Sequence, residues 1–132
     1  MEKLKIIVPV PPSVNACYKN CKTAGRRGRV LTEAARNWKL LAGYAAKAAA
    51  RQAEWQLAAK GTKVVLEIYA FWPDGRRHDM NNSHKLLCDA WEGILYEDDC
   101  SVLTRDMDFG IDRKRPRLEC VIYLKGREAQ DD

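Results

Sequence analysis

The sequence predicts an α+β fold in a single domain: a small mixed β-sheet with two main helices packed on one face. The first observation is the length of 132 residues, which suits one domain with a real core. The second is the order of periodic segments along the chain: strand, helix, strand, helix, strand, strand. The third is a hydrophobic content of 46%, which lies in the globular range and argues against wholesale disorder.

The N-terminal segment predicts one strand followed by a basic loop. Leu4 to Val10 is a β-branched run, and we end the strand at Pro11-Pro12 because proline has no backbone N–H for a strand ladder. In the loop that follows, Gly25 and Gly28 keep a basic segment flexible. Such a loop suits contact with phosphate groups, although a plain surface loop explains it nearly as well.

The first predicted helix runs from Glu33 to about Lys60. Thr32 is a good N-cap, and the segment is rich in alanine and free of proline. We expect Gly61 to end this helix. The residues expected to form its buried stripe recur at helical spacing; they are Leu40, Leu41, Tyr44, Ala45, Ala48 and Gln52. We expect Trp38 and Trp55 to anchor the two ends of this stripe in the core.

The second half of the chain predicts three strands and another helix. Lys63 to Trp72 alternates around a fully apolar face, so we predict a strand that ends at the turn Pro73-Asp74-Gly75. Asn82 to about Leu95 repeats apolar residues every three or four positions, which predicts an amphipathic helix. Ser101 to Phe109 and Arg117 to Leu124 alternate as two further strands, which we expect to form a hairpin.

The chain carries 23 Lys and Arg residues against 18 Asp and Glu, a formal net charge of +5. The excess is concentrated in three groups: within the basic loop, just before the second helix, and from 113 to 117. Three basic groups around an acidic centre indicate a polyanion partner, whereas any one group alone is as easily a solvated surface. The residues expected to bind DNA are Lys19, Lys22, Arg26, Arg27, Arg29, Arg76 and Arg77.

Acidic and amide side chains gather on either side of the second predicted helix. Asp79, Asn81 and Asn82 stand at its start, and Asp98 and Asp99 follow its end. If the strand from 101 to 109 pairs beside the strand from 63 to 72, the two groups return to one place as a carboxylate pocket. Magnesium prefers oxygen ligands and is held by one or two carboxylates plus substrate phosphates. Acids inside a basic rim are typical of a metal-dependent phosphodiester hydrolase.

Lys85 lies one turn into the same helix. Its ammonium group can neutralise charge on a phosphorane-like transition state. A salt bridge to Asp89, four residues further on, explains the lysine about as well. Asn82, Lys85 and Asp89 are expected on one polar face of the helix, away from the apolar stripe.

The sequence lacks the motifs of the commonest other hydrolases and of zinc sites. The sequence contains no Walker loop, no GxSxG and no cysteine spacing of a zinc site, and His78 and His84 are six residues apart rather than four. We find no pattern of a signal peptide, and no run approaches the roughly 20 apolar residues of a membrane helix. We therefore expect a cytoplasmic protein without a membrane partner.

Two motifs and an acidic pair cover most of the chain. Pro11-Pro12-Ser13-Val14-Asn15 is followed by Tyr18, the stretch from Arg76 to Asp89 contains the polar helix start, and Asp98-Asp99 comes after it. These features resemble the RusA family of Holliday junction resolvases, which are small endonucleases of phages and prophages. The first motif resembles the family's Pro-Pro-Ser-x-Asn opening. The second resembles its Asp-x-Asp-Asn-x-x-Lys-x-x-x-Asp signature, and the acidic pair resembles its Asp-Asp pair. We expect residues 1–126 to form a RusA-like endonuclease domain and residues 127–132 a flexible tail.

The resemblance implies a homodimer that binds four-way DNA junctions and makes paired, magnesium-dependent nicks, in a bacterial cell or a phage-infected host. Its catalytic residues would fall on Asp79, Asn81, Lys85 and Asp99, and its metal ligands on Asp79, Asn81, Asp98 and Asp99. The family has a carboxylate at position 81, where this chain has Asn81. An amide oxygen still ligates a metal but brings no negative charge, which weakens magnesium binding.

Asn81 leaves three functions open. The first is a structure-selective endonuclease that resolves Holliday junctions, either as a natural relative that relies on Asp79, Asp98 and Asp99 or as a variant disabled to trap its substrate. The second is a protein that binds four-way junctions without cutting them. The third is an RNA- or protein-binding α+β domain whose acids only cap a helix.

Overall fold

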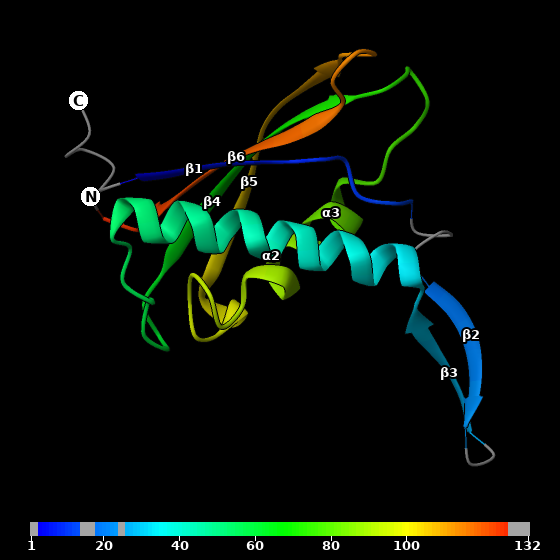
Figure 1. The fold of residues 1–132 in the computed structure, drawn as a ribbon, viewed down its shortest axis with the longest axis horizontal. Coiled ribbons are helices and arrows are strands. Elements are labelled where there is room, and N and C mark those ends of the chain that lie inside the picture. Colours follow the sequence, from blue (N-terminus) through cyan, green and yellow to red (C-terminus); the bar gives the residue numbers. More distant parts are fainter. Residues whose placement is uncertain (1–2, 14–17, 24–25, 127–132) are drawn as a thin grey trace.

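A mixed four-stranded sheet with two helices on one face forms the body of the protein (Figure 1). The computed structural model describes residues 3–13, 18–23 and 26–126, with only the backbone described for 18–23 and 26–29. The predicted α+β class is confirmed, and the expected tail at 127–132 lies outside the described residues. The elements are β1 (Lys3–Val8), β2 (Tyr18–Thr23), β3 (Arg26–Leu31), α2 (Glu33–Ala53), β4 (Val64–Trp72), α3 (Met80–Trp91), the 3-10 turn η1 (Asp99–Ser101), β5 (Val102–Ile111) and β6 (Arg117–Leu124).

The sheet follows the order β1-β6-β4-β5. β6 pairs antiparallel with both β1 and β4, whereas β5 pairs parallel with β4, from Val64 opposite Val102 to Trp72 opposite Ile111. The predicted hairpin of the last two strands is therefore wrong, because β4 lies between them. Central strands are apolar on the face that helices cover, and β6 meets this requirement with Leu118, Cys120 and Ile122 fully buried. β5 is largely exposed and takes the edge.

A separate ribbon of β2 and β3 replaces the predicted basic loop. The two strands pair antiparallel from Tyr18 opposite Leu31 to Thr23 opposite Arg26. They extend from the start of α2 away from the sheet (Figure 1). Two six-residue runs separated by two residues, one of them glycine, form a typical hairpin pattern. The many charged residues in these runs led to the prediction of a loop instead.

α2 begins as predicted, with Thr32 as N-cap accepting from the backbone N–H of Ala35 at 3.3 Å. It ends at Ala53, well before the predicted end near Lys60, because Glu54 adopts a left-handed conformation with φ 55°. The Trp55 indole then donates to the carbonyl of Leu95 at 2.9 Å. This tertiary hydrogen bond stabilises the non-helical conformation of the chain after Ala53.

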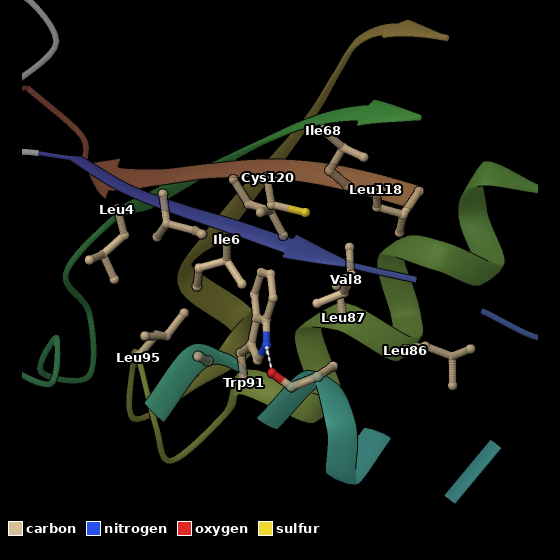
Figure 2. Close-up of a cluster of buried hydrophobic side chains, with 14 of the residues drawn as sticks. Leu4, Ile6, Val8, Ile68, Leu86, Leu87, Trp91, Leu95, Leu118 and Cys120 are labelled. Carbon is tan, nitrogen blue, oxygen red and sulfur yellow. Dashed lines mark hydrogen bonds between the residues drawn. The ribbon is translucent and has the colours of Figure 1, made fainter. Parts of the chain in front are cut away.

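Most of the stripe predicted for α2 is exposed, whereas Trp38, the expected core anchor, is buried. Leu40 and Tyr44 are 58% and 64% exposed, while the small residues and one tryptophan face the core: Ala35, Trp38, Ala42, Gly43 and Ala46. The reason is Trp91 of α3, whose fully buried indole lies between α2 and the sheet and donates to the carbonyl of Ala42 at 2.9 Å (Figure 2). Small side chains let α2 approach closely enough to receive this large ring.

α3 crosses beneath the sheet between the end of β4 and the start of β5. Ser83, Leu87 and Trp91, spaced four residues apart, are buried along one face. Leu86 joins Leu87 and Trp91 in the same core (Figure 2). Within the described ranges, no helix combines the length and the apolar character needed to pass through a bilayer.

Trp91→Ala is expected to lower the free energy of unfolding by about 3–5 kcal/mol, because a large buried ring is lost beneath the sheet. Trp91→Phe keeps most of the ring and loses the hydrogen bond to α2, so its cost should be about 1–2 kcal/mol. Urea denaturation followed by circular dichroism measures both values. Similar losses in the two variants would contradict the packing of this ring between α2 and the sheet.

Candidate functional site

Asp79 caps α3 and stands at the end of the sheet where β4 finishes. One carboxylate oxygen, Oδ1, accepts from the backbone N–H groups of Asn81 at 3.0 Å and Asn82 at 3.3 Å. These two donors would otherwise be unsatisfied in the first helical turn, and the positive end of the helix dipole favours the carboxylate there. Asp79 and Asn81 are both exposed to solvent.

Asn82 points into the protein rather than along a polar face with Lys85 and Asp89, so that prediction is wrong. Its amide Nδ2 donates to the carbonyl of Pro12 at 3.0 Å, and only 8% of the residue is exposed. This bond ties the Pro11-Pro12-Ser13 segment to α3 across 70 positions of sequence. The spacing of Asn82 and Leu86, four residues apart, already indicates a shared buried face.

Two cavities open beside Asp79. One, of about 380 Å³, is lined by the segment 10–13, by Trp72 and Pro73 of the β4 end, and by Arg77, His78, Asp79, Asn82 and Ser83. The other, of about 600 Å³, is lined by the continuous stretch from Arg77 to Asn81. The structure thus brings Arg77, Asp79 and Asn81 together at one open site.

His78 is fixed between two partners. Its ring stacks on Trp72 with centroids 4.2 Å apart and planes 3° from parallel, and Nε2 lies 3.0 Å from Oδ1 of Asp74. The backbone N–H of Arg76 also donates to Oδ1 of Asp74, which lowers the pKa of that carboxyl below its ordinary value. These contacts shape the loop that carries Arg76 and Arg77, and they were not anticipated from the sequence.

Asp98 and Asp99 lie at the opposite end of α3. The backbone N–H of Asp99 donates to Oε2 of Glu92, the C-cap residue of that helix, at 3.0 Å. The strand that follows pairs beside β4 as expected, but in parallel, so it begins where β4 begins. At about 1.5 Å of rise per residue, the 12 residues of α3 separate the two acidic ends by about 18 Å. The predicted return of Asp98 and Asp99 to Asp79 is therefore wrong within one protomer.

Several acidic residues lie together at the C-terminal end of α3. Ligand atoms of Asp98, Asp99 and Cys100 lie within 4.8 Å of one another. Partial burial, followed by the neighbouring carboxylate of Glu92, raises the pKa of Asp99, whereas the backbone N–H of Cys100 lowers the pKa of Asp98. A hydrogen bond to Asp98 raises the pKa of the Cys100 thiol. Two of the three possible donors are carboxylate oxygens, which fit magnesium better than a soft metal.

The remaining predicted residues fall in two places. Lys85 is exposed on α3, one turn after Asn81, between the two acidic ends. Beside it, His84 joins α3 to β5 through a 2.6 Å contact between Nε2 and Oδ1 of Asp106. The basic residues Lys19, Lys22, Arg26, Arg27 and Arg29 lie on β2 and β3, outside the side chains that the structure describes.

Asp79→Ala should lower the free energy of unfolding by about 1 kcal/mol through the lost N-cap, whereas Asp79→Asn, an equally good cap, should stay within about 0.5 kcal/mol of the parent. Chemical denaturation gives both numbers. If magnesium also binds the Asp79 carboxylate, adding magnesium should raise the melting temperature of the parent chain. That rise should be reduced by the same amount in both variants, because both lack the carboxylate. Equal unfolding losses in both variants would show that Asp79 does not cap α3.

Comparison with protein families gives one match that covers most of the chain. The family model described as Endodeoxyribonuclease RusA matches residues 8–123, from the last residue of β1 into β6. A search of curated proteins finds no match. The matched region contains the capped start of α3, both acidic ends of that helix and the basic ribbon. The chain therefore belongs to the RusA family of endodeoxyribonucleases.

Proposed function

We propose that this chain resolves Holliday junctions by paired, magnesium-dependent nicks, in the cytoplasm of a bacterium or of a phage-infected host. The observation that carries the proposal is the open site at the start of α3, where Asp79 and Asn81 adjoin Arg77 in a member of this endonuclease family. Basic side chains bind the phosphate backbone, and oxygen ligands bind the ion.

Each residue has a distinct task in this proposal. Asp79 holds the first turn of α3 with one oxygen and offers the other to the ion. When bound, magnesium lowers the pKa of attacking water and stabilises charge on the leaving oxygen. Lys85, one turn along the helix, stabilises negative charge on the phosphate, and Arg76, which is 87% exposed, holds the backbone next to it.

The separation of the acidic residues supports a homodimer. Magnesium binds oxygen ligands at about 2 Å, so one ion cannot contact both Asp79 and Asp99 of one protomer. A two-fold axis that sets two copies of α3 antiparallel would bring the start of one helix beside the end of its partner. The exposed apolar residues Leu40, Leu41 and Tyr44 on the neighbouring α2 provide surface for such an interface.

Asn81→Asp is expected to increase magnesium-dependent nicking of synthetic four-way junctions by about tenfold or more, because it restores negative charge beside Asp79. Asn37→Asp, the same change on the exposed surface of α2, serves as the control and should leave nicking unchanged. Nicked strands separated on denaturing gels give the rates.

Asn81 also favours the second candidate function, a junction-binding protein without turnover. Tight and branch-selective binding, with no nicking by either the parent chain or Asn81→Asp, would establish that function instead. No preference for four-way over linear DNA would exclude both functions and leave a nucleic-acid or protein-binding domain of another kind.

Mixing two inactive variants tests the shared site. In an Asn81→Asp background, Asp79→Asn and Asp99→Asn are each expected to abolish nicking as homodimers. If one site combines Asp79 with the partner's Asp99, a mixed dimer regains one complete site and nicks one strand. Each variant unfolded and refolded alone is the control. A mixture as inactive as its components would show that the two carboxylates do not act across protomers.

A further inference from the structure

The cavity of about 380 Å³ beside Asp79 has the walls of a slot for a flat ring. Pro11, Pro12 and Pro73 supply apolar surfaces, and the stacked pair of Trp72 and His78 supplies an aromatic one. Two hydrogen bonds position these walls, one from Asn82 to the carbonyl of Pro12 and one between His78 and Asp74. Polar side chains also line the cavity, namely Ser13, Arg77, Asp79, Asn82 and Ser83. Apolar and aromatic walls with convergent polar groups are typical of sites for small ring systems.

The hydroxyl group of Ser83 is a buried polar group at this cavity. Ser83 is 1% exposed and lines the cavity, yet its hydroxyl has no hydrogen-bond partner among the residues that the structure describes. A buried hydroxyl without a partner is destabilising, and buried polar groups are normally satisfied by protein, water or ligand. The other buried polar side chain of this region, Asn82, already donates to Pro12. Ser83 is therefore the buried polar group at this cavity that a ligand atom or a water molecule could satisfy.

We propose that the cavity receives the unstacked base of a nucleotide next to the cleaved phosphate. The inference rests on the proposed function and adds the group that the enzyme recognises beside its metal site. A base has flat faces for the proline and aromatic walls and edge atoms that can donate to, or accept from, Ser83. Arg77 and Asp79 at the same cavity place the connected phosphate next to the ion. The crossover of a junction offers bases whose unstacking costs least.

An abasic-site scan tests this proposal through binding alone, so it does not require a chain that cuts. A base is removed at one junction position at a time, and dissociation constants are measured by fluorescence anisotropy. Calcium, which also takes oxygen ligands, replaces magnesium in the buffer. In each pair of stacked junction arms, we expect one position at which the abasic site weakens binding. The dissociation constant there should rise by about tenfold, because the stacking of one base is lost. At that position Ser83→Leu, which fills the cavity, should bind intact and abasic junctions equally.

Ser83→Ala separates recognition from structure. Loss of the hydroxyl should reduce affinity for the intact junction by about fivefold and leave the abasic junction unaffected. Because the hydroxyl has no partner among the described residues, the urea midpoint should not fall. Thr62→Ala and Thr62→Leu, before β4 at the opposite end of the sheet, are matched controls that should change neither affinity.

Three results would overturn the proposal. Junction-selective binding with no position-dependent abasic penalty would mean that the cavity holds only water, while the proposed function stands. An abasic penalty that persists unchanged in both Ser83 variants would place the base elsewhere. Binding without preference for branched DNA would refute the proposed function first, and the base site with it.

Discussion

The parallel pairing of β5 with β4 is the constraint on which the rest of the structure depends. Parallel neighbours need a crossover, and α3 supplies it by running back beneath the sheet from the end of β4 to the start of β5. The same helix therefore has one end at each end of the sheet. Asp79 caps the first end, and Asp98 and Asp99 lie beyond the second, so the fold itself separates acidic residues that are only about twenty positions apart in sequence.

Hydrogen bonds from buried side chains to backbone carbonyls position this crossover helix. Trp91 bonds to Ala42 in the middle of α2, and Asn82 bonds to Pro12 beyond the end of β1. Because the alanine-rich face of α2 has few large side chains of its own, the Trp91 ring determines how closely the two helices approach (Figure 2). The start of α3 is thus held by its buried face, while its other face remains open for substrate.

Asp79 has one role that the structure shows and one that belongs to the proposed function. As an N-cap it stabilises α3, and in the proposed function its exposed carboxylate also offers an oxygen to magnesium. The electrostatic surroundings of the two acidic ends differ. Asp79 has a neutral amide from Asn81 beside it, whereas Asp99 stands among Glu92, Asp89 and Asp98, and its pKa is raised by partial burial and by this crowding. A cation shared between the two ends would relieve that repulsion, which is a physical reason for the two ends to meet in the proposed dimer.

Local periodicity and caps were sufficient to predict the α+β class, the Thr32 cap and a strand over Lys63 to Trp72, which forms as Val64–Trp72. These features depend on neighbouring residues, so the sequence by itself determined them. Only the tertiary structure decided which face of α2 is buried, which strand occupies the edge, and how far Asp79 lies from Asp99. Each of these depends on contacts between distant segments, such as Trp91 against Ala42 or β6 between β1 and β4, and no spacing within a single element encodes them.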